Sequence, residues 1–210
     1  MPHGFGTRGS TPPPDVWRPE QVHRADVVVL ETGASLPSGP LRADAVVSRQ
    51  RERAIGVVTA DCVPVLLAGE AGDSVAAIHA GWRGLAAGVL ERAVVAFRRV
   101  ASDDPLCAVI GPHIGPCCYE VDGPVLDALG SRYPEALPEA RSNSRPERAL
   151  LDLGALTRLA LGALGLSSSR IGEFPGVCTR CQSERYFSHR RDPTERGRMT
   201  HWVKALGRGA

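Results

Sequence analysis

The chain has 210 residues, of which 43% are hydrophobic, and this is enough apolar material for one α/β domain with a full-sized core. Its formal net charge of +2 comes from scattered basic residues and is too small to indicate nucleic-acid binding. No apolar run approaches the about 20 residues of a membrane-spanning helix, so the sequence predicts no membrane role.

The first residues combine glycine with proline and predict an extended N-terminal loop. The stretch Thr11-Pro12-Pro13-Pro14 cannot form a helix. A strand candidate follows at residues 25–30, and His23 lies directly before it. A lone histidine at a strand edge is most often a surface or core-rim imidazole, so His23 matters only if the fold brings it to other reactive side chains.

Two short apolar runs, at residues 54–58 and 75–78, predict buried strands. The first leads to Cys62 and the second to His79, so a thiol and an imidazole stand near the ends of strands. Pro64 follows the thiol closely, and it predicts a sheet edge or a break in pairing that leaves the thiol accessible.

Helical patterns occupy two later parts of the chain. Apolar side chains recur at helical spacing from Leu85 to Phe97 and predict one amphipathic helix. The exposed amides at its start, with Arg83 beside them, suit an anion such as phosphate. A strand is predicted at residues 106–110, a polar loop at residues 134–146, and a second amphipathic helix from Leu153 that stops at Gly165.

Six cysteines occur in a chain with no apolar signal segment at its start, so the sequence predicts reduced thiols in the cytoplasm. Cys117 and Cys118 are adjacent, and in a strand they would point to opposite faces and could not easily bind one metal ion together. Cys178 and Cys181 form one half of a zinc motif without a second half at a suitable spacing, so structural roles are expected for all four. His113 lies on a glycine-flanked loop and is a candidate substrate contact.

Five motifs, in order along the chain, carry a resemblance to a known family. They are Gln21-Val22-His23, Thr59-Ala60-Asp61-Cys62-Val63-Pro64, His79-Ala80-Gly81-Trp82-Arg83-Gly84, Ile110-Gly111-Pro112-His113-Ile114-Gly115-Pro116-Cys117-Cys118-Tyr119-Glu120-Val121 and Phe187-Ser188-His189-Arg190-Arg191. The set resembles the laccase-domain family, once called multicopper polyphenol oxidase. That family is described as purine nucleoside phosphorylase with adenosine deaminase activity, and also as a peptidoglycan editing factor.

The resemblance implies an α/β (α+β) fold, with residues 1–210 forming a single domain of mixed β-sheets layered between helices. It also implies a likeness to the catalytic domain of the cytotoxic necrotizing toxins. A zinc ion, with copper as the alternative metal, is implied at His23, Cys62 and His79. One thiolate and two imidazoles suit Zn²⁺ and leave a fourth position open, and such an open zinc site supplies hydroxide at neutral pH.

Purine nucleosides and inorganic phosphate are the substrates that the resemblance implies, the nucleosides being adenosine, inosine, guanosine and methylthioadenosine. For deamination, Asp61 is the candidate proton carrier beside Cys62 and His79. For phosphorolysis, Arg83 and Arg8 are candidate phosphate ligands, because a guanidinium group matches phosphate bidentately.

Other functions stay open. Cys62 and His79 suit the nucleophile and base of a metal-free amide hydrolase, which would fit the peptidoglycan-editing description. A non-catalytic metal- or nucleotide-binding module is a third interpretation. Copper-dependent phenol oxidation is the least favoured, since one Cys/His₂ site cannot make several copper centres. The family has a longer segment before Gln21 than this chain, which bears on substrate specificity, and the oligomeric state is open.

Overall fold

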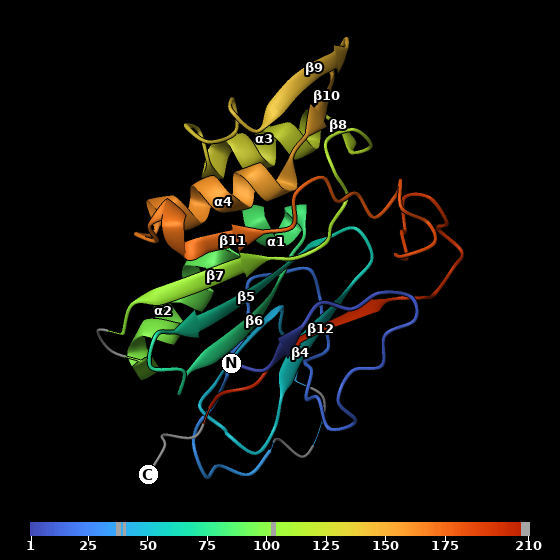
Figure 1. Ribbon diagram of the computed structural model, residues 1–210. Coiled ribbons are helices and arrows are strands. Elements are labelled where there is room, and N and C mark those ends of the chain that lie inside the picture. The colour runs from blue at the N-terminus through green and yellow to red at the C-terminus, as the bar shows by residue number, and fades with distance from the viewer. Residues whose placement is uncertain (37–38, 40, 102–103, 207–210) are drawn as a thin grey trace.

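This computed structural model describes residues 1–36, 39, 41–101 and 104–206. In chain order (Figure 1) the elements are β1 (His3–Gly4), β2 (Val27–Leu30), β3 (Ala45–Ser48), β4 (Ile55–Thr59), β5 (Val63–Gly69), β6 (Val75–Ala80), α1 (Trp82–Ala86), α2 (Val89–Ala101), β7 (Leu106–Ile110), β8 (Glu120–Asp122), α3 (Gly123–Arg132), β9 (Arg141–Arg145), β10 (Arg148–Leu151), α4 (Leu153–Ala163), the 3-10 helix η1 (Ser168–Arg170), β11 (Ile171–Glu173) and β12 (Met199–Val203). Strands β1 to β6 come first along the chain, and helices and strands are mixed after them. Among the described residues, no helix has the length and apolar character needed to cross a bilayer.

A six-stranded mixed sheet forms the centre of the fold, with strand order β11-β7-β5-β6-β3-β2. The strand β5 runs antiparallel to both of its neighbours, whereas the outer pairs β2–β3 and β7–β11 are parallel. A smaller sheet has the order β1-β12-β4, and a third sheet, β8-β10-β9, stands with α3 at the upper end of the molecule in Figure 1.

Both faces of the six-stranded sheet are buried, because alternate residues of its strands enter two different cores. On one face Val65 and Ile78 pack into a cluster with apolar side chains of α1, α2 and α4. On the other face Leu66 and Ala77 pack with side chains of β4 and β12. The predicted α/β domain with mixed sheets and covering helices is therefore confirmed.

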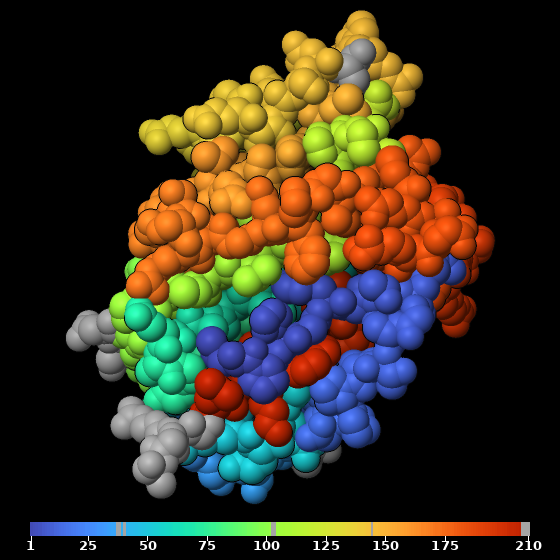
Figure 2. All heavy atoms as spheres, in the orientation of Figure 1, coloured from blue at the N-terminus to red at the C-terminus, as the bar shows by residue number. Residues whose placement is uncertain are grey.

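Segments that are distant in the sequence lie side by side on the surface in Figure 2, where the blue N-terminal residues border the red β12. His3 and Gly4 pair with Val203 and Trp202. The strand β12 also pairs along its length with β4, from Met199 opposite Thr59 onward. The C-terminal strand thus supports the strand that leads directly into Cys62.

Two predictions from the sequence, one about residues 85–97 and one about Pro64, are wrong. The helix predicted from Leu85 to Phe97 is two helices, α1 and α2, because Gly88 between them has φ +85°, a left-handed conformation that interrupts the helix. Pro64 does not mark a sheet edge, since β5 lies between β6 and β7. Proline fits there as the second residue of the strand, where its carbonyl accepts from the Gly111 amide at 2.8 Å.

The polar loop predicted at residues 134–146 is partly a strand. Residues 141–145 form β9, which pairs antiparallel with β10. The predicted end of the second helix agrees with the structure, because α4 ends at Ala163 and Gly165 follows with φ +90°.

Candidate metal centre

Three side chains from different parts of the chain meet beside β6. The ligand atoms of His23, Cys62 and His79, here called the candidate metal centre, lie within 4.8 Å of one another. The two imidazole rings meet edge to face, with centroids 4.8 Å apart. His79 is only 3% exposed, whereas His23 is exposed and Cys62 is partly buried, so the site has one closed side and one open side.

A buried carboxylate that the sequence analysis did not single out holds the two histidines. Asp44 Oδ1 accepts from His79 Nδ1 at 2.7 Å and from the His23 amide at 2.9 Å, and Oδ2 accepts from the Arg24 amide at 2.7 Å. Because Nδ1 of His79 is occupied by Asp44, Nε2 is the nitrogen that is left for a metal. One signal for Asp44 was present, since it is a lone charge at the start of the apolar run Ala43-Asp44-Ala45-Val46-Val47.

Hydrogen bonds of the Gln-Val-His motif hold the loop that places His23 at the candidate metal centre. The Gln21 side chain donates to the Val58 carbonyl at 2.8 Å and accepts from the Val58 amide at 2.7 Å, which fixes the loop to β4. His23 itself has φ +57°, a left-handed conformation that non-glycine residues rarely adopt. The amide bonds to Asp44 hold this turn and thereby stabilise its strained conformation.

Gly81 makes room for the thiol. A Cβ atom at this position would stand 2.9 Å from Cys62 Sγ and 3.8 Å from a ring carbon of His23. Pairing of Val63 with Ala80 across β5 and β6 brings these two turns together. The first glycine of the His-Ala-Gly-Trp-Arg-Gly motif is therefore required by close packing at the candidate metal centre.

Cys62 and His79 change each other's protonation. Burial alone would raise the pKa of the Cys62 thiol, but the charge of His79 and hydrogen bonds with both imidazoles lower it to about 6. Burial would lower the pKa of His79, but the Cys62 thiolate and the hydrogen bond to Asp44 raise it to about 9. These shifts favour a thiolate at neutral pH, which is the form that binds metal or attacks a substrate.

Asp61 connects the candidate metal centre to the C-terminal segment, residues 176–192. It has φ +95°, and its carboxylate is buried. Oδ1 accepts from Thr179 Oγ1 at 2.6 Å, and Oδ2 accepts from the Arg190 amide at 2.6 Å. Both oxygens thus accept hydrogen bonds from the C-terminal segment. A role for Asp61 as proton carrier stays a prediction.

The three candidate substrate contacts occupy different surroundings. Arg83 is exposed, with its guanidinium 4.5 Å from the centre of the Trp82 ring. Arg8 makes a bidentate ion pair with Glu195, at 3.0 and 2.8 Å. His113 Nδ1 donates to the Gly111 carbonyl at 2.8 Å, and its ring packs against the start of α4. Substrate binding by all three stays a prediction.

Tyr119 is a neighbour of the site that the sequence analysis did not select. Burial raises the pKa of its phenol above the usual range, and so does the charge of Cys62, while Arg190 and Arg83 act in the opposite direction. The Arg190 guanidinium lies 5.0 Å from the centre of the Tyr119 ring. Tyr119 and Arg83 therefore share the electrostatic surroundings of Cys62.

A second group of metal-ligand side chains lies within the described residues. It consists of Cys117, Cys118, Cys178 and Cys181, here called the four-cysteine cluster, whose sulfurs lie within 4.8 Å of one another. Cys117 and Cys118 lie in a turn and not in a strand, so the reason given for expecting that they cannot easily bind one metal ion together does not apply.

Residues 7–205 match the family described as multi-copper polyphenol oxidoreductase laccase. The purine nucleoside phosphorylase YfiH of Escherichia coli is 41% identical over 197 residues, which cover 93% of this chain and 75% of that protein. A purine nucleoside phosphorylase of Pseudomonas aeruginosa is 41% identical over 172 residues, with coverage of 82% and 67%. A protein named adenosine deaminase RL5, from an unknown prokaryotic organism, is 35% identical over 192 residues, with coverage of 88% and 72%.

Solved structures share the fold. A Neisseria meningitidis protein superimposes with a TM-score of 0.80 at 36% identity, over 92% of this chain and 76% of that one. YlmD of Geobacillus stearothermophilus gives a TM-score of 0.81 at 32% identity, over 90% and 73%. The further likeness to the catalytic domain of cytotoxic necrotizing toxins stays a prediction.

Proposed function

Because the chain belongs to the multi-copper polyphenol oxidoreductase laccase family, we propose that it is a zinc-dependent purine nucleoside phosphorylase that also deaminates adenosine. The names of its relatives support both activities. The observation that carries the proposal is the meeting of one thiol and two imidazoles at a site with an open side. Its substrates would be inorganic phosphate and the nucleosides adenosine, inosine, guanosine and methylthioadenosine.

The residues of the candidate metal centre suit zinc better than they suit cations that prefer oxygen ligands. A thiolate and two imidazoles are a three-ligand set for Zn²⁺, and the Asp44–His79 hydrogen bond fixes the tautomer that a metal needs. Zinc in such a site supplies Lewis acidity and hydroxide at neutral pH. Phenol oxidation with copper is less well supported, because a laccase needs several copper centres and this Cys/His₂ set provides one.

Within this proposal, Arg83 is a better phosphate ligand than Arg8. Both oxygens of Glu195 already bind the Arg8 guanidinium, so phosphate would have to displace a bidentate carboxylate. Arg83 is exposed and shares the surroundings of Tyr119 with Cys62. Phosphate at Arg83 would then lie on the same side as a nucleoside whose base contacts Tyr119.

Asp61 is the proposed proton carrier of the deamination, since it is adjacent to Cys62 in the chain. Its two hydrogen bonds, from Thr179 and from the Arg190 amide, orient the carboxylate. Proton transfer requires that one of these bonds be exchanged for a bond to the substrate.

The test incubates purified protein with adenosine, with and without phosphate, and separates the products. We expect adenine and ribose 1-phosphate in the presence of phosphate, and inosine without it. Arg83→Ala is expected to raise the KM for phosphate at least about tenfold and to keep the zinc content, because it removes a charged hydrogen-bond donor. Arg92→Ala, an exposed arginine on α2, is the matched control. An unchanged phosphate dependence in Arg83→Ala would exclude this role.

A thiol hydrolase is the second candidate, and the mutual stabilisation of thiolate and imidazolium at Cys62 and His79 favours it. In that case zinc removal by a chelator would leave activity intact, whereas alkylation of Cys62 would abolish it. The substrate to try is then an amide that joins an amino acid to a muramyl nucleotide. Loss of nucleoside turnover on chelation, with recovery on zinc addition, would exclude this candidate.

A further inference from the structure

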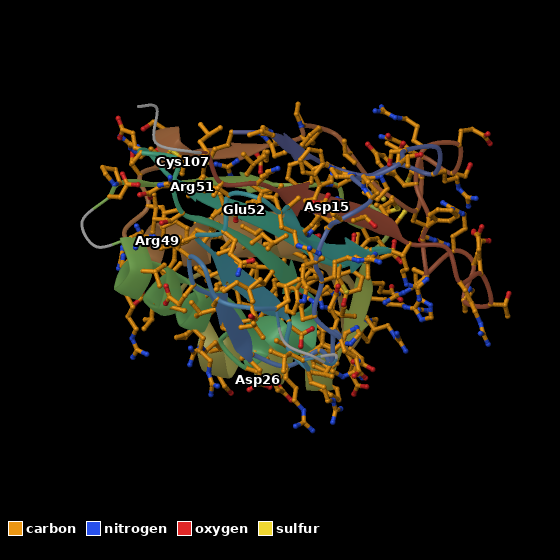
Figure 3. The ribbon with its side chains drawn as sticks, turned by 90° about the horizontal axis from the view of Figure 1, so that it is seen from below. Asp15, Asp26, Arg49, Arg51, Glu52 and Cys107 are labelled. Carbon is orange, nitrogen blue, oxygen red and sulfur yellow. The ribbon has the colours of Figure 1, made fainter. Side chains whose placement is uncertain are left out.

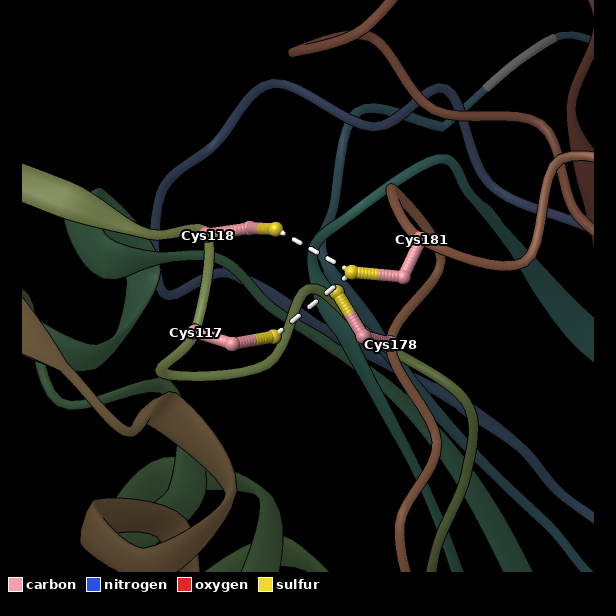
Figure 4. A group of neighbouring side chains, drawn as sticks. All are labelled: Cys117, Cys118, Cys178 and Cys181. Carbon is pink, nitrogen blue, oxygen red and sulfur yellow. Dashed lines mark hydrogen bonds between the residues drawn. The ribbon is translucent and has the colours of Figure 1, made fainter.

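The four cysteines of the four-cysteine cluster point their sulfurs toward one another from two loops (Figure 4). The Sγ atoms of Cys118 and Cys181 are 3.3 Å apart and those of Cys117 and Cys181 are 3.7 Å apart. All four are free thiols, and these separations are far beyond the about 2.05 Å of a disulfide bond.

We propose that the four-cysteine cluster binds a structural zinc ion, in addition to any metal at the candidate metal centre. Four thiolates around zinc at about 2.3 Å in a tetrahedron have their sulfurs about 3.8 Å apart. The two separations given above are 3.3 and 3.7 Å, and all four sulfurs lie within 4.8 Å of one another, so small side-chain adjustments produce that geometry. A complete set of four thiolates leaves no open position, which makes the site structural and not catalytic.

The turn at Gly115 explains how adjacent cysteines reach the same point. The amides of Cys118 and Tyr119 both donate to the Gly115 carbonyl, at 3.0 and 3.1 Å, so the chain curls back and does not alternate as a strand would. A Cβ at Gly115 would stand 3.2 Å from the Cβ of Cys178. Glycine therefore lets the two loops approach closely enough for their thiols to meet.

The second loop supplies a Cys-x-x-Cys pair, and Arg191 holds this loop in place. The backbone N–H of Gln182 donates to the Cys178 carbonyl at 3.0 Å, and this bond closes the turn that places Cys178 and Cys181 side by side. Arg191 donates to the carbonyls of Thr179 and Arg180, at 2.9 and 3.0 Å. These bonds hold the loop that carries the cysteine pair, while Nε of the same guanidinium forms an ion pair with Asp192 at 2.7 Å.

The four-cysteine cluster also positions a neighbour of the candidate metal centre. Thr179 lies between the two cysteines of the pair, its amide donates to the His113 carbonyl at 3.0 Å, and its hydroxyl donates to Asp61. Zinc between the two loops would hold this hydrogen-bonded contact, because ligands from both loops would be fixed to one ion. The C-terminal segment is thus fastened next to Cys62.

The first experiment counts metal in the protein purified under reducing conditions and dialysed against zinc-containing buffer and then metal-free buffer. We expect two zinc ions per chain, one in His23→Ala and one in the double variant Cys178→Ser/Cys181→Ser. Cys107→Ser is the matched control and should retain two, since Cys107 lies in β7 outside both groups (Figure 3). Two zinc ions retained in the double variant, or one zinc ion in the unchanged protein that His23→Ala abolishes, would overturn the proposal.

The second experiment does not depend on how well the double variant folds. His23→Ala is loaded with Co²⁺, whose sulfur-to-metal charge-transfer absorption rises with the number of thiolate ligands. A tetrathiolate spectrum supports the four-cysteine site. An intact mass lower by four hydrogens, which reports two disulfides, or bound iron with acid-labile sulfide would each overturn zinc binding there. Neither experiment involves nucleoside turnover, so this proposal and the proposed function can fail separately.

Discussion

Asp44 is not one of the three ligand residues of the candidate metal centre, and it acts there through its hydrogen bonds to His23 and His79. Asparagine at this position would keep the size, but its side-chain nitrogen donates, so asparagine cannot accept all four bonds that the carboxylate receives from His79 and from the amides at residues 22–24. We expect Asp44→Asn to weaken zinc binding about 10–100-fold, as loss of the partner of a histidine ligand does. Competition with a chromogenic chelator measures this. Asp26→Asn changes an exposed carboxylate (Figure 3) and is the control; equal affinities in the two variants would show that Asp44 does not orient His79.

Gly81 affects the same centre by its lack of a side chain. Its φ of −77° is accessible to any residue, so Gly81→Ala introduces no backbone strain and only a contact at 2.9 Å with Cys62 Sγ. The sulfur must move, and we expect zinc affinity to fall about tenfold or more because metal sites tolerate little displacement of a ligand. Gly123→Ala is the control, because nothing lies within 4 Å of a Cβ there. Zinc affinity equal to that of Gly123→Ala would contradict the steric argument.

At the level of single elements, β12 carries a buried histidine that makes stability depend on pH. The Gly6 amide donates to Nδ1 of His201 at 3.3 Å, so Nε2 carries the proton and donates to Thr59 Oγ1 at 2.8 Å. Burial, and after it the charge of His79, lowers the pKa of His201 to about 3. Below about pH 6.5 the unfolded chain binds a proton here that the native state does not, so stability falls as pH falls.

We therefore expect His201→Gln to flatten the dependence of unfolding free energy on pH between about 4 and 6, by at most about 1.4 kcal/mol per pH unit. Urea unfolding of both proteins at several pH values measures the two slopes. His3→Gln, which replaces an exposed imidazole on β1, is the control. Parallel slopes for the unchanged protein and His201→Gln would show that His201 is protonated as readily in the native state as in the unfolded chain.

Local patterns predicted elements where burial was strong and failed where it was weak. The runs that became β4, β6 and β7 are apolar and buried, and Gly165 ended α4 as expected. By contrast, β9 is polar, with the sequence Arg141-Ser142-Asn143-Ser144-Arg145, and forms by pairing with β10, which no local pattern reveals. The break at Gly88 was also hidden, because the apolar spacing continues across it.

At the scale of the whole molecule, contacts between distant parts of the chain build the site. Gln21 binds Val58, and Asp61 binds the Arg190 amide, pairs that are separated by 37 and 129 positions. The family motifs pointed to three ligand residues, but spacing alone could not have brought them together. The same limit hid the four-cysteine cluster, since its two halves are joined by folding and not by a short loop.

Docking of the C-terminal segment is testable at Thr179. Thr179→Val keeps the shape of the buried side chain but removes the hydroxyl that donates to Asp61 at 2.6 Å, leaving a buried carboxylate oxygen without that partner. We expect a loss of about 1–3 kcal/mol in unfolding free energy. We also expect faster tryptic cleavage at the arginines of residues 176–192 under native conditions, because local opening of this segment becomes less costly.

Thr194→Val, at an exposed threonine, is the control for the loss of a hydroxyl group. Urea unfolding gives the change in free energy, and mass spectrometry of the tryptic fragments locates the cleavage. If the global stability of Thr179→Val falls while cleavage within residues 176–192 stays at the rate of Thr194→Val, the Asp61 contact stabilises the core without fastening the segment. If both change together, the segment and the strand end that carries Cys62 form one cooperative unit.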